Sequence, residues 1–587
     1  MKRYILFIAL GAVMLSACAK LDLNDPSAAS SGNWYKTAEQ VRYSLNDFYR
    51  STFYVLETNY VTDRHSDDWN QRTTAYSMIN GNMTSSAADG NTNMQYKTVW
   101  SYRYKNISRA NRIIEALKNI EGITDDEKNT LEAEARCFRA MAYSQLISLY
   151  GEVPFYLTDI TPEQAFALGR TPVAEVLKQV YEDYDFAIKW LPKDNFVDNV
   201  YRIEKGAAYG FKARIALEMR DYETAKAAAK GCMDLNKYSL FPDYGELFTD
   251  KTHNSEVIFA IPHSIELEID EDGTPTTSAR KSFILRGAGG TSTASPSWDL
   301  LAAYECTDGL TIDESPLFHP ENPYLNRDPR CNYTFCAPDS VIYGIQYNPY
   351  PDVPYVMDYV SGTPVQNRDS RGAAASSDAT NSTYNSTILK KGATMTWRTS
   401  MYDDNNVIVL RYADVLLMYA EAMIECNTID PSVLLAINEV RARAYKVKVT
   451  ETGKYPVITT TDQVKLRRVV RRERRVELAW EGRRFYDVRR WGILEKSLAD
   501  HCYGHATGAN FNNNKGKFYW PCAPQRLNDP ENDIFYFKNV SDASNGLIIA
   551  HVNRKYDPKC YRLPIPDTEI VTMADTTGKR FYQNPGY

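Results

Sequence analysis

The chain has 587 residues and is mildly acidic, with 74 acidic and 68 basic residues and a formal net charge of −6. With 43% hydrophobic residues it can bury a sizeable core, and its charge argues against a general attraction to nucleic acids or other polyanions. Its ten cysteines are scattered singly, which excludes a small disulfide-stapled fold. The one close pair, Cys331 and Cys336, leaves a local disulfide open.

The N-terminus has the pattern of an export signal. Lys2 and Arg3 precede an apolar run over residues 4–15, which is too short for a permanent membrane span. The next residues, "LSAC" ending at Cys18, look like a bacterial lipobox. We therefore expect residues 1–17 to be a lipoprotein signal peptide and Cys18 to carry the lipid that anchors the mature chain. The alternative is an ordinary signal peptide with a coincidental cysteine.

Helical periodicity follows over long stretches. Residues 96–151 predict a helical hairpin, whose second helix begins after Thr124 and ends at Gly151. Further helices are expected over residues 172–190, 204–219, 221–233, 411–426 and 431–445. Several form pairs with alanines where helices must pack closely, similar to degenerate tetratricopeptide repeats. The sequence predicts a mainly α-helical scaffold over about residues 35–260 and 407–500.

Two segments lack this periodicity, about residues 265–406 and 502–557. Gly, Pro, Ser, Thr and Tyr dominate the first of them. Long irregular segments within compact proteins carry function or are disordered. Asp270, Asp272 and Gly273 resemble part of a calcium loop, but the later ligands are missing and a hairpin turn is the favoured interpretation. The sequence predicts neither a metal site nor a cofactor.

Residues 467–491 contain ten arginines and four acidic residues. This density first suggests a nucleic-acid patch, but an exported protein does not ordinarily meet a genome. In a helix, Leu466, Val470 and Trp480 lie on one face, with Glu473 in the middle of the apolar stripe. A carboxylate there requires a partner, and arginine is the usual one. We predict an internal Arg–Glu lattice that joins the last helices, and no nucleic-acid ligand.

Several long segments together resemble the SusD/RagB family of outer-membrane nutrient-binding lipoproteins. They include "NVIVLRYADVLLMYAEAMIE", "INEVRARA", "RRERRVELAWEGRRFYDVRRWG" and "YRLPIPDTEIVTMADTTGKRFYQNPGY". The resemblance covers residues 18–587 and implies a mainly α fold, with tetratricopeptide-like helical pairs supporting a large irregular, loop-rich ligand-binding half. It also implies a non-catalytic receptor, lipid-anchored in the outer membrane and facing the exterior. Such a receptor captures an oligosaccharide or polysaccharide and delivers it to a SusC-like TonB-dependent barrel transporter.

Candidate ligand residues rest on chemistry, because the family has no fixed binding motif. An aromatic ring beside carboxylates and amides suits a sugar, whose C–H face stacks on the ring while its hydroxyls bond the polar groups. One such cluster comprises Asp67, Asp68, Trp69, Asn70 and Arg72. Further candidate platforms are Trp298, Tyr343, Tyr347, Tyr350 and Trp397. The alternative is that the tryptophans are loop anchors or core residues.

Two other functions are considered: peptide capture by the same fold, and a surface glycoside hydrolase. The carboxylate pairs Asp67/Asp68 and Asp403/Asp404 are available. Neighbours in sequence do not, however, give the opposed carboxylates, roughly 5–9 Å apart, of a glycosidase. The sequence also lacks G-x-S-x-G and H-E-x-x-H motifs. It therefore favours a binding protein that is not an enzyme.

Overall fold

The computed structural model describes most of the chain, namely residues 34–58, 62–72, 79, 83–84, 96–197, 200–263, 281–371, 382–399, 405–506, 519–577 and 581–587. Some sequence predictions fall outside these residues. They are the signal peptide over 1–17, Cys18, the turn at Asp270, Asp272 and Gly273, and the pair Asp403 and Asp404.

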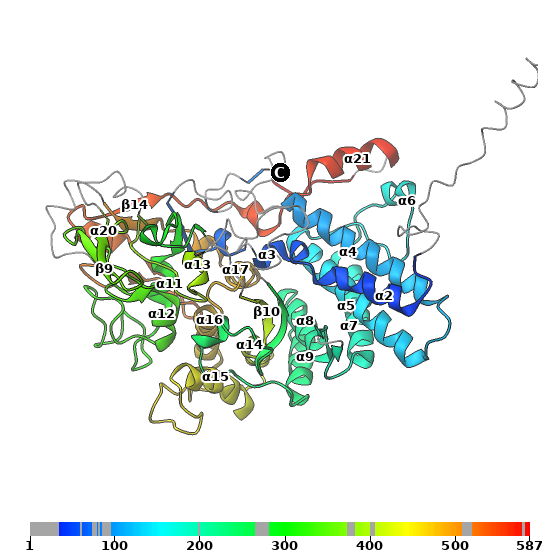
Figure 1. Cartoon of the computed structure of the whole chain (residues 1–587), viewed down its shortest axis with the longest axis horizontal. Coiled ribbons are helices and arrows are strands. Elements are labelled where there is room, and N and C mark those ends of the chain that lie inside the picture. Colours follow the sequence, from blue (N-terminus) through cyan, green and yellow to red (C-terminus); the bar gives the residue numbers. More distant parts are fainter. Residues whose placement is uncertain are drawn as a thin grey trace, which may run out of the picture.

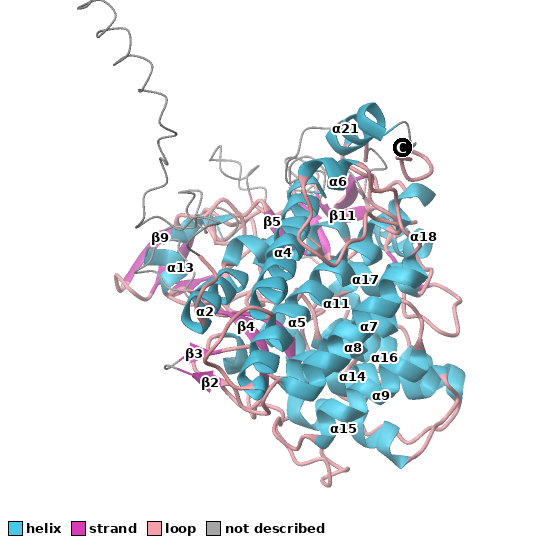
Figure 2. Cartoon of the chain, turned by 90° about the vertical axis from the view of Figure 1, so that its right-hand side faces the viewer, coloured by secondary structure: helices cyan, strands magenta, loops and turns pink. Residues whose placement is uncertain are grey.

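Helices form most of the regular structure, as Figure 2 shows. Their bounds are α2 (Ala38–Asn46), α3 (Val55–Thr58), α4 (Tyr96–Leu117), α5 (Asp125–Tyr150), α6 (Pro162–Phe166), α7 (Val173–Trp190), α8 (Lys205–Glu218), α9 (Tyr222–Asp234), α11 (Trp298–Ala303), α12 (Pro329–Thr334), α13 (Thr396–Thr399), α14 (Tyr412–Glu425), α15 (Pro431–Ala444), α16 (Gln463–Glu477), α17 (Arg484–Arg490), α18 (Leu494–Ser497), α20 (Lys538–Ala543) and α21 (Asp567–Thr577). Short 3-10 turns are η1 (Asp47–Tyr49), η2 (Ser51–Tyr54), η3 (Asp63–His65), η5 (Glu246–Phe248), η6 (Arg286–Ala288) and η8 (Pro558–Tyr561).

The strands are short and pair antiparallel. Their bounds are β1 (Trp69–Gln71), β2 (Phe196–Val197), β3 (Val200–Tyr201), β4 (Val257–Ile261), β5 (Ala294–Pro296), β6 (Val341–Ile342), β7 (Ile345–Gln346), β8 (Tyr355–Asp358), β9 (Thr363–Gln366), β10 (Val407–Arg411), β11 (Cys502–His505), β12 (Gln525–Arg526), β13 (Phe535–Tyr536) and β14 (Ile548–Val552). β6 to β9 form a four-stranded meander, while β1–β5, β2–β3, β4–β10, β11–β14 and β12–β13 are two-stranded.

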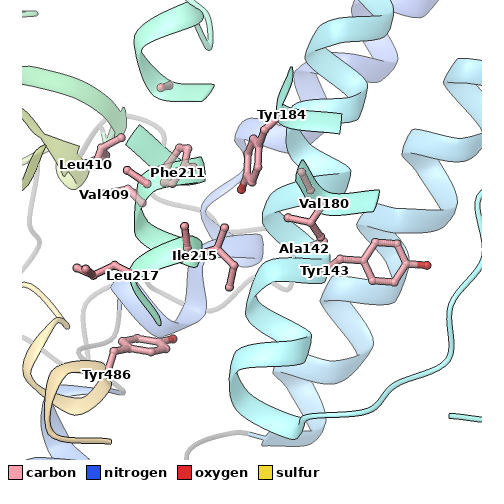
Figure 3. Packing of buried hydrophobic residues seen from close by; sticks show 14 of the residues in the cluster. Ala142, Tyr143, Val180, Tyr184, Phe211, Ile215, Leu217, Val409, Leu410 and Tyr486 are labelled. Carbon is pink, nitrogen blue, oxygen red and sulfur yellow. The ribbon is translucent and has the colours of Figure 1, made fainter. Parts of the chain in front are cut away.

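The predicted helical scaffold is confirmed. The hairpin over residues 96–151 is α4 and α5, and the pair over 204–233 is α8 and α9, each packed against its partner. Figure 1 places α2, α4, α5 and α7 at one end of the molecule and α14 to α16 near its middle. Figure 3 shows the core between them, where Phe211 and Ile215 of α8 lie between Tyr184 of α7 and Val409 of β10.

Local chemistry fixes the ends and contacts of these helices. The Thr124 side chain accepts a hydrogen bond from the Glu127 backbone N–H and starts α5. Gly151 ends α5 at a φ of 80°, where a Cβ would also lie 2.5 Å from the Arg562 guanidinium. Within α8, a Cβ on Gly210 would lie 2.5 Å from the Leu410 side chain. Gly210 therefore lets β10 approach the helix.

The loop-rich half is an excursion from the scaffold. β4 pairs with β10, so the chain between residues 261 and 407 leaves and returns at one two-stranded sheet. This segment is not devoid of regular structure, since it contains α11, α12 and the β6–β9 meander. These helices and strands have at most six residues each, which is too short for a hydrophobic periodicity to show them in the sequence. Side chains of α11 and α12 join those of residues 503–548 in a second core around Trp69, Trp298 and Trp520. The buried side chains of the meander belong to a third core, which also contains Trp397.

The predicted Arg–Glu lattice is confirmed, and α16 lies at its centre. Glu473 is 1% exposed and accepts hydrogen bonds from Arg330 at 2.5 Å and Arg441 at 2.9 Å. Glu477, one turn further along, is 0% exposed and is bound by Arg330, Arg411 and Arg443. Although burial alone would raise it, these guanidinium groups hold the pKa of Glu477 far below its usual range.

The arginines of the run bind carboxylates from elsewhere in the chain. Arg475 contacts Asp67 at 2.9 Å and Asp68 at 2.6 Å, more than 400 residues away in sequence. Arg490 contacts Glu421 of α14 at 2.5 Å. The lattice therefore connects the scaffold, the Asp67 loop and α12, rather than the last helices alone.

We expect Glu477→Gln to lower the free energy of unfolding by about 3–5 kcal/mol, because three guanidinium groups would lose a buried counter-charge. The measurement is urea unfolding of the variant at pH 7, followed by circular dichroism. Glu451→Gln is the matched control, since Glu451 pairs with Lys454 at the surface and its loss is expected to cost less than about 1 kcal/mol. Equal effects of the two substitutions would contradict a central role for α16.

Candidate functional site

The structure places the predicted Trp69 cluster in the interior. Trp69 is 2% exposed and stacks on Trp480 with ring centroids 4.6 Å apart. Asp67 is bound by Arg475 and Arg484, which hold its pKa below the usual range against the effect of burial. The prediction of an exposed platform at Trp69, flanked by free carboxylates, is therefore wrong. The alternative of a loop anchor fits these contacts.

The other members of that cluster differ. Asp68 is bound by Arg475, and Asn70 is 2% exposed and donates to Ser295 Oγ. Only Arg72, which follows β1, is partly exposed among the cationic and acidic residues of the set.

Trp298 and Tyr347 are also interior residues. Trp298 is 2% exposed, its indole N–H donates to the Asn385 carbonyl at 2.9 Å, and its ring packs against Trp520. Tyr347 is 1% exposed and donates to the Ser386 carbonyl at 2.7 Å. Surface platforms at these two positions are likewise wrong, because both rings and both polar edges are already occupied. Tyr350 is half-buried beside Tyr519.

The remaining two candidates, Tyr343 and Trp397, are interior residues as well, 5% and 1% exposed, but they lie together beside an open cavity. Their rings are stacked with centroids 6.0 Å apart. Tyr343 lines a cavity of about 390 Å³, and Trp397 lines an adjoining one of about 80 Å³. Phe248, Lys391 and Gly392 line both. We call the larger cavity the aromatic groove. Its walls are Asp243, Gly245, Glu246, Phe248, Thr249, Tyr333, Val341, Ile342, Tyr343 and residues 390–395.

Tyr333 is held in the groove by its surroundings. It belongs to α12, whose Arg330 is fixed in the carboxylate lattice. A Cβ on Gly245 would lie 2.4 Å from the Tyr333 ring, so glycine allows the backbone to approach the ring. The Lys446 ammonium lies 5.5 Å from the ring centroid and pairs with Asp243 at 2.5 Å.

The polar groups of the groove are of two kinds. The Lys391 ammonium already has three acceptors, because it donates to Tyr244 Oη, the Ala479 carbonyl and Glu481. Burial lowers the pKa of Lys391 to about 8. Lys390 and Glu246 are more exposed, and within the described ranges no ion-pair partner contacts either. Aromatic faces beside uncommitted donors and acceptors suit a polyhydroxylated ligand.

Sequence reasoning missed Tyr333 and Phe248. Tyr333 lies within "CNYTFC", which attracted attention for its cysteines, and those cysteines are buried free thiols. No local signal distinguishes Tyr333 from the other tyrosines of the chain, because its position depends on α12 being held by α16.

Two further properties concern only the described part of the chain. There, no group of three histidine, cysteine or acidic side chains is arranged to hold a metal ion. In the same residues, none of the helices has the length and apolar character needed to cross a membrane.

Comparison with known proteins identifies the family. The model of the SusD family matches residues 255–587, and one described as starch-binding associating with outer membrane matches residues 22–217. The chain, with its helical scaffold and loop-rich half, belongs to the SusD family.

Individual relatives match this chain at low sequence identity. SusD-like protein P2 of Formosa agariphila is 24% identical over 528 residues, covering 84% of this chain and 91% of its own length. The crystal structure of a SusD-like carbohydrate-binding protein from Bacteroides fragilis matches with a TM-score of 0.72 and 24% identity, covering 92% of this chain and 98% of that one. A laminarin-binding SusD-like protein matches with a TM-score of 0.57 and 19% identity, covering 94% and 100%.

We expect Trp298→Ala to lower the free energy of unfolding by about 3–5 kcal/mol, because it empties a well-packed interior position. Urea unfolding checks this, with Tyr355→Ala as control, since Tyr355 is 64% exposed. Unchanged stability of the Trp298 variant together with loss of glycan binding would instead support a surface platform.

Proposed function

We propose that this chain is a non-catalytic receptor for an oligosaccharide or polysaccharide, and that the aromatic groove binds the sugar. The observation that carries the proposal is the groove itself, where Tyr333, Tyr343 and Phe248 surround a cavity of about 390 Å³. Sugar rings stack on such faces through their C–H groups, while Lys390 and Glu246 are placed to bond hydroxyls. The carbohydrate-binding and laminarin-binding relatives support this choice of ligand class.

We further propose that the receptor is anchored in the outer membrane by lipid on Cys18, faces the exterior, and delivers its ligand to a TonB-dependent barrel transporter of the SusC type. Support comes from the "LSAC" sequence ending at Cys18 and from the outer-membrane association in the family description. The groove carboxylates support a binding role, because Asp243 and Glu246 lie on one turn and Asp243 is paired with Lys446. They are not opposed across a ligand as a glycosidase requires.

Tyr333→Ala is expected to weaken glycan binding by about tenfold, which corresponds to ~1.4 kcal/mol of lost stacking. Isothermal titration calorimetry measures this against a panel of starch, laminarin, other plant, microbial and host polysaccharides, and a peptide digest. Tyr43→Ala is the matched control, because Tyr43 is 56% exposed on α2, at the opposite end of the molecule from α12 (Figure 1).

The outcomes separate the candidate functions. Equal binding by Tyr333→Ala and wild type would remove the groove as the site. Binding of peptides but of no glycan would favour the peptide-capture alternative. Cleavage of a bound glycan during prolonged incubation would contradict a non-catalytic receptor.

Cys18→Ala is expected to release the protein from membranes, since the acyl chains would be its anchor. Cell fractionation and intact-mass measurement check this, with Cys426→Ala as a cysteine control. Retention of the Cys18 variant in the membrane fraction would contradict lipid anchoring.

A further inference from the structure

Three arginines from separate segments meet on one side of the loop-rich half. Arg72 follows β1, and its backbone N–H donates to the Thr293 carbonyl at 2.8 Å. Arg286 begins η6, and Arg371 donates its backbone N–H to the Pro349 carbonyl at 3.0 Å. The guanidinium groups lie within electrostatic range of one another. Burial is the main cause of the lowered pKa values of Arg72 and Arg371. The charge of Arg286 lowers the pKa of Arg72 further, and the charge of Arg72 does the same to Arg371.

Two of these guanidinium groups have no counter-charge among the residues that the structure describes. Within the described ranges, no carboxylate lies within 4 Å of Arg72 or Arg371. Arg371 is 2% exposed; its Nε donates to the His505 carbonyl at 3.1 Å, but its buried Nη1 has no acceptor. The Nη1 of Arg72 is buried without an acceptor as well. Buried donors in native proteins are nearly always satisfied, so each exception calls for an explanation.

Among the described residues, the groups around Arg72 and Arg371 are backbone amides, an aromatic ring and an imidazole rather than free carboxylates. Asp369 accepts hydrogen bonds from the backbone N–H groups of Arg286 and Gly287, each at 2.9 Å, and from the Ser292 hydroxyl. Burial raises the pKa of Asp369, and the Arg286 charge helps to lower it against this effect. Tyr384 lies 4.9 Å from the Arg371 guanidinium and stacks on His551. Burial, together with Arg371, lowers the pKa of His551 to about 4, so this imidazole is neutral at pH 7.

The cluster is accessible at Arg72 and Arg286, and it adjoins the same sheet as the aromatic groove. Arg72, Arg286 and Tyr384 are each partly exposed. Gly287, next to Arg286, packs against Ile345 of β7, with a Cβ placed on it 3.7 Å from Ile345 Cδ1. The neighbouring strand β6 contributes Val341 and Ile342 to the groove.

We propose that Arg72, Arg286 and Arg371 bind the anionic group of an acidic saccharide, either a uronate carboxylate or a sulfate ester. This inference rests on the proposed glycan-binding function and names its ligand class. A guanidinium group matches both anions, because its planar donors form paired, charge-assisted hydrogen bonds to two oxygens. The stacked Tyr384 and His551 rings supply an adjacent apolar wall against which a sugar ring can lie.

The test compares charged and neutral forms of one backbone. The full chain, purified in detergent, is titrated with oligogalacturonate and with its methyl ester, and separately with a sulfated galacto-oligosaccharide and its desulfated form. The charged form of one pair is expected to bind about tenfold or more tightly than its neutral form, with an affinity that falls as salt rises. Whichever pair shows the difference identifies carboxylate or sulfate.

Arg371→Gln and Arg72→Gln are each expected to abolish the preference for the charged form, so that the charged and neutral forms bind the variant with similar affinity. Arg112→Gln, at an exposed pair with Asp159, is expected to change neither. Urea unfolding of the free protein supplies a second measurement. Arg371→Gln should not lower the unfolding midpoint, because it removes an uncompensated buried charge. A marked loss of stability would instead overturn the proposal by assigning Arg371 a structural role.

Different results would contradict the anion site and the glycan-binding function. Equal binding of charged and neutral forms by wild type would overturn the anion site while leaving glycan binding intact. An unaltered preference in both arginine variants would do the same. Failure of every saccharide to bind would overturn glycan binding and the anion site with it.

Discussion

Carboxylates and guanidinium groups that pair in the interior along α16 hold the scaffold and the loop-rich half together. Glu473 and Glu477 lie one turn apart and face Arg330 from the loop-rich half as well as Arg411 and Arg443 from the scaffold. Burying such pairs contributes little net stability, because desolvation offsets the Coulomb attraction. Leaving one member unpaired is costly. The pairs therefore fix which segments meet, and so they fix where α12 and the aromatic groove lie.

Much of the helical scaffold could be predicted from the sequence, because α4, α5 and α7 to α9 are long enough for their apolar faces to repeat several times. The presence of an Arg–Glu lattice could also be predicted, since Glu473 interrupts an apolar stripe. Which residues pair with one another in the lattice could not be predicted. Arg330 and Asp67 lie far from α16 in sequence, and nothing local to either residue indicates which charge it meets. The short strands and helices between β4 and β10 escaped prediction because they are held by tertiary contacts rather than by periodicity.

The candidate site was predicted only in part, and the physical reason is the dual character of aromatic residues. A tryptophan gains much from burial, and its single N–H needs only one acceptor. Trp298 meets both conditions inside the second core through Asn385, so its presence in a loop-rich segment did not indicate exposure. Asp67 and Asp68 looked like sugar ligands beside Trp69 because carboxylates are ordinarily exposed. Here Arg475 binds both of them in the interior.

Two groups of buried arginines differ in the partners that they contact. Along α16 and α17, most guanidinium groups have a carboxylate within hydrogen-bonding distance, even where the two residues are hundreds of positions apart. The chain has more acidic than basic residues, so carboxylates are not in short supply. Yet Arg371 is as buried as Arg475 and has no acidic partner among the described residues. Other buried arginines without a carboxylate in the described part of the chain, such as Arg327 and Arg489, donate instead to two or more backbone carbonyls. Arg371 has one such acceptor, the His505 carbonyl, and the proposed ligand anion would supply the counter-charge.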